Sequence, residues 1–600
     1  MTIYNAPIRD MQFLYHELLN ADRLTEIPAY KSFSPDIIDA ILNEANKFAK
    51  EILLPLNISG DKEGSTLKNG VVNTPDGFKE AYKKFCDGGW TSLAGEQKFG
   101  GQGAPASLYF LIQEMIVASN MAFGMFSGLT EGAYNAIRLH GSEEQKQTFL
   151  PKFIEGTWSG TMCLTEPQCG TDLGLIKTTA YPEGPEKYKI EGTKIFISCG
   201  EHDLTENIVH LVLARLPNAP TGIKGISLFV VPKFLDFTAS KNKKRNLVSC
   251  GSIENKMGIK ASPTCVMNFD QAVGWLVGEP HKGMRAMFTM MNAARLGVGI
   301  QGLGLAEVSY QNALKYAQDR VQGRSLSDTK IIKGDADPII VHPDVRKNLL
   351  TMKAMSEGIR ALSMWVAFNL DKAEKSLDVE EQKTADDLVQ LLTPIIKAFA
   401  TDQGFLMTNL GLQVYGGHGY IQEHGMEQFV RDARITQLYE GTNGIQAMDL
   451  VGRKMATHYG RYLRSFFHPL YQFVQDHRDN KDMQQFIIGL TKSFGRLQQA
   501  TAYIAQKGMN NPEEAAAAAT DYLNLFGYVA VAFMWARTVK IAIEKNQTDD
   551  SGFYTGKLQT AQFYYERILP ETGSLLAKIM AGANSTVDIK ESTFRSSYAA

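Results

Sequence analysis

The sequence predicts an α+β protein with an N-terminal α-helical domain, a central antiparallel β domain, a C-terminal helical bundle and an extra C-terminal helical domain. Three observations predict this order. Apolar residues recur at helical spacing before Gly156, short β-branched runs follow it, and helical spacing returns after about Gly283. Because 600 residues exceed what one hydrophobic core usually organises, we expect several packed domains.

The first strong helix signal is the motif Ser34-Pro35-Asp36, which combines an N-cap residue, a first-turn proline and an acidic first turn. Apolar residues then recur at helical spacing until Pro55. Two further helices are predicted before Gly156, from Ser107 to about Ala118 and from Glu143 to Phe153.

The central β domain is indicated by five short runs that are β-branched or alternate in polarity, separated by Gly, Pro and Asn. These runs are TMCLTEP, YKIEGTKIFIS, NIVHLVLARL, GISLFVVPKF and TCVMNFD. The pattern is typical of an antiparallel sheet.

Helical spacing returns from about Gly283 and continues to about Lys454. A last helical block has its clearest start at Asn511-Pro512-Glu513-Glu514, and the apolar helix after it is expected to be buried in a bundle or a subunit contact. The predicted domains are an N-terminal extension over residues 1–35, an α domain over 36–156, a β domain over 157–282, an α-bundle domain over 283–455 and an additional helical domain over 456–600.

Composition excludes several classes of protein. With 62 Lys and Arg against 64 Asp and Glu, the net charge of −2 excludes a strongly basic nucleic-acid binder, and an apolar content of 44% excludes a disordered chain. The longest apolar run, Leu525–Ala536, is shorter than the roughly 18 residues that a membrane span needs, so no span is expected. The N-terminus lacks a signal-peptide pattern. The six cysteines show neither a CxxC pair nor metal-ligand spacing, which indicates reduced thiols in a cytoplasm and no metal site.

One motif invites a wrong interpretation. Gly297, Gly299 and Gly302 satisfy GxGxxG, but a dinucleotide-binding site needs a strand before the first glycine. The preceding GMRAMFTMMNAARL looks helical, and the following residues continue the same helix. Small residues in such a helix more often mark a place where something flat or bulky comes close.

Three other segments carry more Gly, Thr and acidic residues than their surroundings need. They are CLTEPQCGTD from Cys163, QVYGGHGY from Gln413 and RDARITQLYEGTN from Arg431. The first offers backbone amides and hydroxyls that suit a polar heterocycle or phosphate, although a turn explains it equally well. Glu440, in the third, lacks a basic i+4 partner because position 444 is glycine. In an apolar cleft such a carboxylate is a competent base, whereas most glutamates beside a turn are simply solvated.

Together these segments resemble the signatures of the acyl-CoA dehydrogenase family of flavoproteins. The resemblance covers about residues 36–455, and both ends of the chain resemble a longer bacterial subgroup of that family. It implies an acyl-CoA dehydrogenase-like fold, FAD as cofactor, and α,β-desaturation of an acyl-CoA thioester. Short- or medium-chain acyl-CoA and 3-methylthiopropionyl-CoA are the implied substrates.

The resemblance also implies roles for individual residues. Glu440 would remove the α-proton, and its backbone N–H would polarise the thioester oxygen. Substrate would also be contacted by Thr171, Arg295 and Gly441. The implied FAD contacts are Met162, Leu164, Thr165, Gly170, Thr171, Phe196, Ser198, Arg320, Gln413, Gly416, Gly417 and Thr442. The chain departs from the family pattern at Cys169, Gln428, Gly444 and directly after Arg320, where Val-Gln-Gly replaces an aromatic residue.

The implied partners are acyl-CoA, an electron-transfer flavoprotein or similar acceptor, and further copies of the chain in a homodimer or homotetramer. The oligomer follows from Arg320, which matches an arginine that reaches the FAD of a neighbouring subunit. Two alternatives remain open. An acyl-CoA oxidase shares the reductive half-reaction but passes electrons to oxygen. A flavin-containing DNA-binding relative with an inert site is disfavoured by the charge balance and by the intact Tyr439-Glu440-Gly441-Thr442.

Overall fold

The computed structural model describes residues 2–184, 186–237, 244–327, 335–595 and 597. The chain divides into two compact units. One comprises Ile3–Ala6 and Asp36–Gly297, and is called here the β unit. The other comprises Met1–Thr2, Pro7–Pro35 and Val298–Ala600, and is called the helical unit.

The β unit begins with helices, as the sequence predicts. They are α2 (Pro35–Phe48), α3 (Pro55–Glu63), α4 (Phe78–Asp87), α5 (Ala106–His140) and α6 (Glu143–Ile154), with a short hairpin of β1 (Thr66–Lys68) and β2 (Val71–Asn73) between α3 and α4. The chain after Phe48 continues as one π-helical turn, Ala49–Leu53, up to Pro55. Helix α5 is far longer than the predicted segment from Ser107 to Ala118 and is kinked at Asn120, whose backbone is not helical.

Seven strands follow and form one sheet. They are β3 (Trp158–Cys163), β4 (Thr179–Pro182), β5 (Lys187–Ser198), β6 (Asn207–Arg215), β7 (Ile226–Pro232), β8 (Val248–Ile253) and β9 (Thr264–Val277). The order is β3-β6-β4-β5-β9-β7, with β8 beside β9, and the additional pairing of β6 with β7 closes the sheet on itself. Each of the five predicted runs contains strand residues, but TMCLTEP does so only over Thr161–Cys163, and β4 and β8 are additional.

The central β domain is therefore confirmed, with one correction to its antiparallel topology. Strand β3 runs parallel to β6, and β4 touches β6 in parallel at a single residue pair. A parallel pair needs a long crossover, and the chain supplies one because β4 and β5 lie between β3 and β6 in sequence. The remaining pairs are antiparallel.

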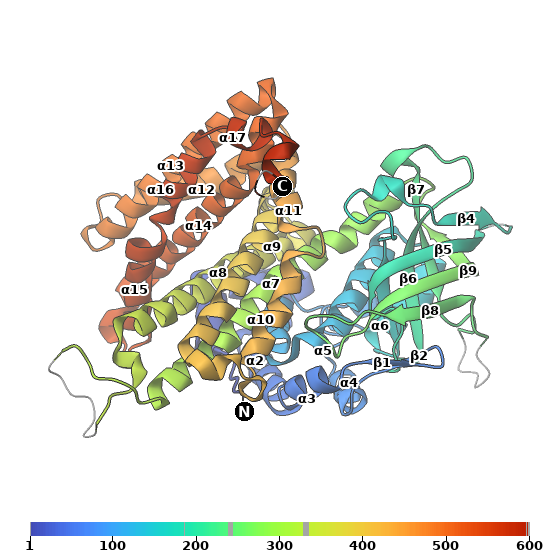
Figure 1. Cartoon of the computed structure of the whole chain (residues 1–600), viewed down its shortest axis with the longest axis horizontal. Helices are drawn as coiled ribbons and strands as arrows, with labels where there is room; N and C mark the ends of the chain where they lie inside the picture. Colours follow the sequence, from blue (N-terminus) through green and yellow to red (C-terminus); the bar gives the residue numbers. More distant parts are fainter. Residues whose placement is uncertain (1, 185, 238–243, 328–334, 596, 598–600) are drawn as a thin grey trace. The chain divides into compact units, whose positions relative to one another are not determined.

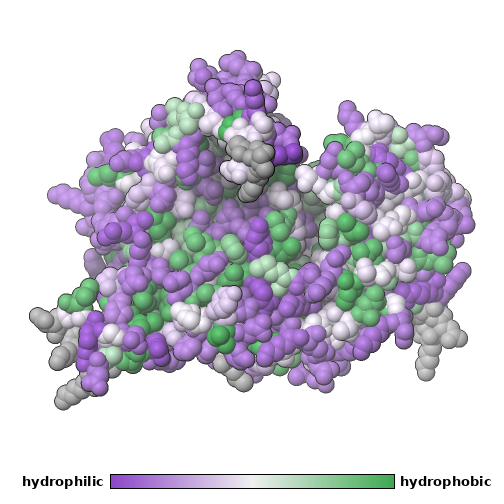
Figure 2. Space-filling model, in the orientation of Figure 1, coloured by the Kyte–Doolittle hydropathy of each residue, from purple (hydrophilic) through white to green (hydrophobic). Residues whose placement is uncertain are grey.

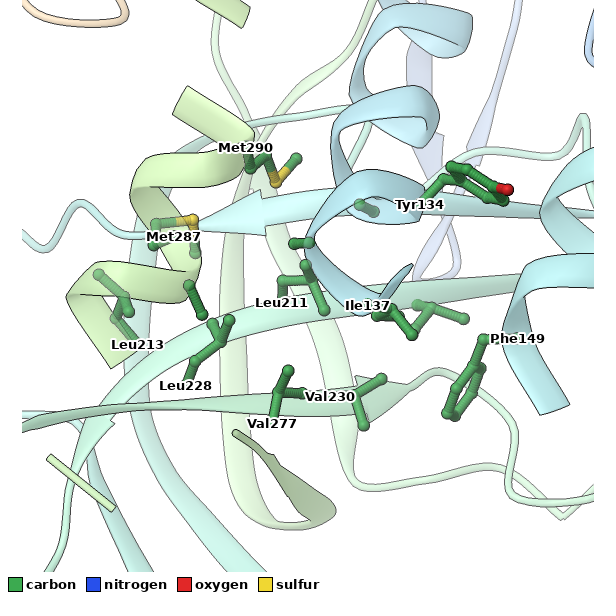
Figure 3. Close-up of a cluster of buried hydrophobic side chains, with 14 of the residues drawn as sticks. Tyr134, Ile137, Phe149, Leu211, Leu213, Leu228, Val230, Val277, Met287 and Met290 are labelled. Carbon is green, nitrogen blue, oxygen red and sulfur yellow. The ribbon is translucent and has the colours of Figure 1, made fainter. Parts of the chain in front are cut away.

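Helices α5, α6 and the start of α7 pack on this sheet to form a hydrophobic core (Figure 3). Tyr134 and Ile137 of α5 and Phe149 of α6 meet Leu211 and Leu228 of the sheet. Glycine allows the close approach of α5 to β3, because a Cβ at Gly160 would overlap the Cβ of Ala133. This core supports β3, the strand that leads into the CLTEPQCGTD segment.

The helical unit contains the second half of a long helix, α7 (Gly283–Asp319), and the helices that follow it. These are α8 (Pro343–Lys375), α9 (Val379–Tyr415), α10 (Met426–Arg434), α11 (Asn443–Asp449), α12 (Arg461–His477), α13 (Gln484–Asn510), α14 (Pro512–Lys545), α15 (Phe553–Phe563), α16 (Glu571–Met580) and α17 (Asn584–Val587). The short α1 (Ile8–Gln12), from the N-terminal extension, belongs to the same unit. Figure 1 shows α8 and α9 side by side and α13, α14 and α16 grouped in the C-terminal block.

The GxGxxG segment lies within α7, so the rejection of a dinucleotide loop is confirmed. Its glycines bring α7 against α9. A Cβ at Gly302 would lie 2.5 Å from the carbonyl oxygen of Ala400, and one at Gly404 would overlap the backbone of Gly302. The group that comes close to these small residues is therefore another helix.

The N-terminal extension is held to the helical unit by buried charges. Asp10 accepts hydrogen bonds from Arg360 (Nη1 to Oδ2, 2.6 Å) and from Lys557. Arg360 also binds Glu307 at 2.7 Å, and Lys557 binds Glu357 at 2.8 Å. These five residues, together with Lys353 on Glu357, alternate in sign and join α1, α7, α8 and α15.

Two helical segments are long and apolar enough to cross a membrane, Ala106–His140 and Pro512–Thr548. Within their most apolar windows, 94% and 72% of the residues are buried inside the chain. A core helix passes the same test of length and composition, so the two segments are weak evidence for a span. The face drawn in Figure 2 mixes hydrophilic and hydrophobic side chains.

Candidate active site

The first group of predicted flavin contacts lies where β3 ends. Met162 and Leu164 are partly buried, whereas Gly170 and Thr171 are exposed. Between them, Glu166 and Cys169 exchange both backbone hydrogen bonds, at 2.9 and 3.0 Å, and so form a tight turn. The turn leaves the amide-bearing backbone of Gly170 and Thr171 at the surface, as a loop that binds a polar ligand requires.

A buried ion pair underlies this loop. Lys194 of β5 and Glu166 are both almost fully inaccessible and lie 2.8 Å apart, and the same ammonium donates to the carbonyl oxygen of Leu164 at 3.0 Å. Thr178 donates to Glu166 through its backbone N–H and its hydroxyl. Burial by itself would raise the pKa of Glu166, but Lys194 and these hydrogen bonds lower it to about 2. The ionised pair therefore fixes the loop on β5, and sequence reasoning gave neither residue this part.

Strand β5 adds the predicted aromatic contact beside the loop. The N–H of Ile195 donates to the carbonyl oxygen of Thr165 at 2.9 Å, which ties the strand to the loop. The next residue, Phe196, lies at a bulge in β5 with a left-handed φ of 58° and keeps 59% of its surface exposed. Ser198, two residues on, is partly buried. The structure thus brings Thr165 and Phe196 together and presents the ring to solvent.

The predicted base, Glu440, lies in a strained turn of the helical unit. Glu440 and Gly441 both have left-handed backbone conformations, with φ of 57° and 84°. This region is disfavoured for a residue with a side chain, and such strain persists only where the surroundings impose it. Glu440 is partly buried.

Three side chains impose this turn. Gln446 of α11 donates from Nε2 to the carbonyl oxygen of Glu440 at 3.0 Å, and Lys397 of α9 donates to that of Gly441 at 2.8 Å. Asn443 accepts from Lys397 at 2.9 Å and donates to Asp402 at 2.7 Å. Sequence reasoning missed all three, and the only available signal for Lys397 was a cation inside the apolar run TPIIKAFA.

The neighbours of Glu440 are also held. Burial raises the pKa of Tyr439, so its phenol stays protonated and donates to Gln301 of α7. Thr442 is exposed and is the N-cap residue of α11, with its carbonyl oxygen accepting from the N–H groups of Ile445 and Gln446. The predicted contacts Gly441 and Thr442 therefore share one turn with Glu440.

Arg295 lies in the first half of α7, which belongs to the β unit. This residue is buried, with only 5% of its surface exposed. Its guanidinium carbon lies 6.0 Å from the centre of the Phe288 ring, and Nη1 donates to Asn292 at 3.4 Å. Its role toward substrate stays a prediction.

The remaining predicted contacts gather at the C-terminal ends of α7 and α9. Tyr316, one turn before Arg320, stacks on Tyr415 with ring centroids 4.1 Å apart, and Gln413, Gly416 and Gly417 flank that tyrosine. Arg320, Gln413 and both glycines are exposed, and a Cβ at Gly416 or Gly417 would meet open space. Asp402, which accepts from Asn443 in the Glu440 turn, comes before Gln413 on α9. At a rise of 1.5 Å per residue, the two residues lie about 16 Å apart along the helix axis. The helical unit therefore carries two groups of predicted contacts that lie well apart.

Comparisons with known proteins decide the family. Models of the N-terminal, middle and C-terminal domains of acyl-CoA dehydrogenase match residues 38–157, 161–272 and 281–455, and a model described as acetyl-CoA dehydrogenase C-terminal like matches residues 466–590. The chain belongs to the acyl-CoA dehydrogenase family. It is an acyl-CoA dehydrogenase, an oxidoreductase of a family that uses FAD.

Individual relatives resemble this acyl-CoA dehydrogenase over its full length. A 3-methylmercaptopropionyl-CoA dehydrogenase of Ruegeria pomeroyi is 40% identical, covering 96% of this chain and 98% of its own. A broad-specificity linear acyl-CoA dehydrogenase of Mycobacterium tuberculosis is 32% identical, covering 99% and 100%. The crystal structure of an acyl-CoA dehydrogenase complexed with FAD from Bacillus anthracis has a TM-score of 0.74 at 21% identity, covering 92% and 89%. The predicted family, fold class and cofactor are confirmed, whereas the domain boundaries and the individual site residues stay predictions.

The residues of this acyl-CoA dehydrogenase fit FAD. The exposed Phe196 ring beside Thr165 offers a flat apolar surface for a flavin ring, and Gly170 and Thr171 offer backbone amides next to it. The open space above Gly416 and Gly417 allows a nucleotide to approach the backbone. The first group of features lies in the β unit and the second in the helical unit.

Proposed function

We propose that this acyl-CoA dehydrogenase oxidises an acyl-CoA thioester to the trans-2-enoyl-CoA with Glu440 as the catalytic base. FAD, when bound, accepts the β-hydrogen as a hydride at N5. The chain's own task is to remove the α-proton, to orient the thioester and to exclude water. A carboxylate on a rigid turn suits this task because the α-proton is weakly acidic and the base must be in place before it acts.

The observation that carries the proposal is the strained turn at Glu440. Two consecutive left-handed residues are held by hydrogen bonds to their carbonyl oxygens, from Gln446 and from Lys397. With these carbonyls engaged by the protein, the two peptide planes that follow Glu440 are fixed, and the carboxylate stands on a rigid backbone. In the proposed reaction the backbone N–H of Glu440 would donate to the thioester oxygen, where a preorganised donor stabilises the negative charge that develops.

The same proposal assigns the cofactor and substrate contacts. In the β unit, Met162, Leu164, Thr165, Gly170, Thr171, Phe196 and Ser198 would hold the flavin. Thr442 would contact the pyrophosphate, and Thr171, Arg295 and Gly441 would contact the substrate. Gln413, Gly416 and Gly417 would bind the adenosine part of FAD. Arg320 would reach the FAD pyrophosphate of a neighbouring subunit, so the enzyme would be a homodimer or homotetramer.

The names of the relatives guide the proposed substrate. Short- or medium-chain acyl-CoA and 3-methylthiopropionyl-CoA come first, since the Ruegeria pomeroyi relative is named for the latter thioester. Electrons would leave to an electron-transfer flavoprotein in the cytoplasm. An acyl-CoA oxidase is distinguished by mixing the anaerobically reduced enzyme with oxygen, because rapid reoxidation by oxygen would assign the oxidase instead.

The experiment for the proposed base is Glu440→Gln. The amide keeps the shape of the side chain and the backbone N–H but cannot accept a proton. Loss of a general base typically costs about 10²–10⁴ in rate, and we expect the upper end for anaerobic flavin bleaching by acyl-CoA. The flavin and acyl-CoA should remain bound, because neither depends chiefly on this carboxylate.

A second readout isolates the proton step. The β-carbon of 3,3-dimethylbutanoyl-CoA carries no hydrogen, so exchange of its α-protons in D₂O reports the base without any hydride transfer. Exchange should fall in parallel with bleaching in Glu440→Gln. Glu380→Gln, at an exposed carboxylate of α9, serves as the control and should keep both rates. Bleaching by Glu440→Gln within tenfold of the unchanged enzyme would place the base elsewhere.

A further inference from the structure

A lysine is completely buried beneath the Glu440 turn. Lys397 lies in the middle of α9, within an apolar stretch, and has no exposed surface. Its ammonium group donates to the carbonyl oxygen of Gly441 at 2.8 Å and to Oδ1 of Asn443 at 2.9 Å. Full burial of an ammonium group is expensive, so its retention at this position calls for an explanation.

The Gly441 and Asn443 acceptors show which part of the chain Lys397 holds. Both belong to the segment directly after Glu440, and one of them is the carbonyl oxygen of the left-handed Gly441. An ammonium group binds a carbonyl oxygen more strongly than a neutral donor does, and low polarity strengthens the bond further. Lys397 therefore supplies the strongest type of hydrogen bond available to hold this strained backbone.

The support beneath Lys397 is itself rigid. Its helix, α9, packs against α7 so closely that a Cβ at Gly302 would lie 2.5 Å from the carbonyl oxygen of Ala400. Asn443 continues the contact one turn along α9, donating to Thr401 at 2.9 Å and to Asp402 at 2.7 Å. On the other side of the turn, Gln446 holds the carbonyl oxygen of Glu440. The turn is thus fixed between α9 and α11.

We propose that Lys397 is a positioning residue for the α-proton abstraction, acting through the Gly441 carbonyl to set where the Glu440 carboxylate stands. The inference rests on the proposed role of Glu440. Without the ammonium group, the turn loses its strongest constraint and the left-handed backbone relaxes. A displacement of about 1 Å at a reacting group is enough to lower a rate about 10²-fold. Most of the proposed substrate and FAD contacts lie outside this turn, so the binding of both should change less than the rate.

The test compares two variants of Lys397 with a matched lysine. Lys397→Met keeps the length of the side chain without its donor, and Lys397→Gln keeps a polar group that is too short to reach the turn. Lys454→Met is the control, since Lys454 is also buried and also donates to α9, at Gln390 (2.8 Å), away from the turn. Each variant is purified as the FAD-loaded enzyme, and rates are expressed per bound flavin.

We expect kcat to fall about 10²-fold in both Lys397 variants while KM stays within threefold. The α-proton exchange of 3,3-dimethylbutanoyl-CoA should fall by the same factor, which loss of folded enzyme alone would not cause after normalisation to flavin. Lys454→Met should keep kcat within twofold. A Lys397 variant with kcat and exchange within threefold of the unchanged enzyme would overturn the proposal, and so would failure of both variants to fold with FAD. Retained activity in Glu440→Gln would instead refute the proposed function.

Discussion

The buried charges around Asp10 predict a large effect of one conservative substitution in the N-terminal extension. Asp10→Asn replaces the carboxylate that accepts from both Arg360 and Lys557 with an amide of the same shape. Burial by itself would raise the pKa of Asp10, but Lys557 and Arg360 lower it to about 2. The folded chain therefore favours the ionised carboxylate, and the amide cannot replace it.

The magnitude follows from the contacts. Removing one partner of a buried ion pair costs about 3–5 kcal/mol, because the other charge is left without compensation. Here Arg360 still binds Glu307 and Lys557 still binds Glu357, so we expect the lower end, about 3 kcal/mol. Since the pKa of Asp10 is lower in the folded chain than its usual value of about 3.9, this stabilisation is present above about pH 4 and is lost as the pH falls toward 2.

Native-state proteolysis measures the loss of docking at residues 7–35 themselves. A loss of about 3 kcal/mol in the docking of residues 7–35 raises their open population about 10²-fold, and cleavage follows that population when opening is fast. Trypsin should therefore cut after Arg23 or Lys31 about 10²-fold faster in Asp10→Asn, followed by mass spectrometry at pH 7.5. Glu26→Gln, at an exposed pair with Arg23, should change the rate by less than threefold. An unchanged cleavage rate in Asp10→Asn would refute the idea that these charges dock the extension.

Two further predictions concern stability. Burial, and then Lys233, lower the pKa values of His202 and His210 to about 3, so the unfolded chain binds protons below about pH 6.5 that the folded chain does not, and each histidine should remove about 2 kcal/mol of stability at pH 5. Urea midpoints of the β unit should therefore fall less between pH 7.5 and 5 in His210→Gln than in the unchanged chain, and equal falls would contradict the prediction. Gly302→Ala should destabilise by about 1–3 kcal/mol because its Cβ meets the backbone of α9, whereas Gly297→Ala in the same helix meets open space and should not destabilise. Thermal melts of the two variants compare them directly, and equal melting temperatures would show that α7 and α9 separate without cost.

Much of the fold is readable from the sequence because its elements follow local rules. The start at Asn511-Pro512 is confirmed by the N-cap bond from Glu513 N–H to Asn511, at 3.0 Å. Each of the five β-branched runs contains strand residues. Strand β4 escaped prediction because its four residues end in proline and alternate weakly, and β8 because its sequence contains serine and glycine. The parallel pairing of β3 with β6 is a property of topology that no local pattern contains.

The candidate site also contains residues that the sequence reveals and residues that only the structure reveals. Exposed residues in glycine-rich turns, such as Thr171 and Gly416, stand out in the sequence because turns and ligand loops share a composition. The buried charged residues beneath these turns do not stand out in the sequence. Lys194 occurs in an alternating strand and Lys397 in an apolar helix, where a lysine is ordinarily expected to extend its ammonium group to water. Only the tertiary structure shows that both ammonium groups turn inward to carbonyl oxygens of a loop.

The two lysines point to a shared principle in the site. In the β unit, Lys194 holds the Leu164 carbonyl next to a loop that faces Phe196, and in the helical unit Lys397 holds the Gly441 carbonyl next to Glu440. Phe196 and Glu440 are also non-glycine residues with left-handed backbones, at φ of 58° and 57°. Strain of this kind needs external support, and a buried ammonium group gives strong support to a carbonyl oxygen without occupying the ligand-facing side. The predicted flavin contact and the predicted base are therefore each presented by a strained residue whose neighbouring backbone is anchored from below, and this is the arrangement that the Lys397 variants test.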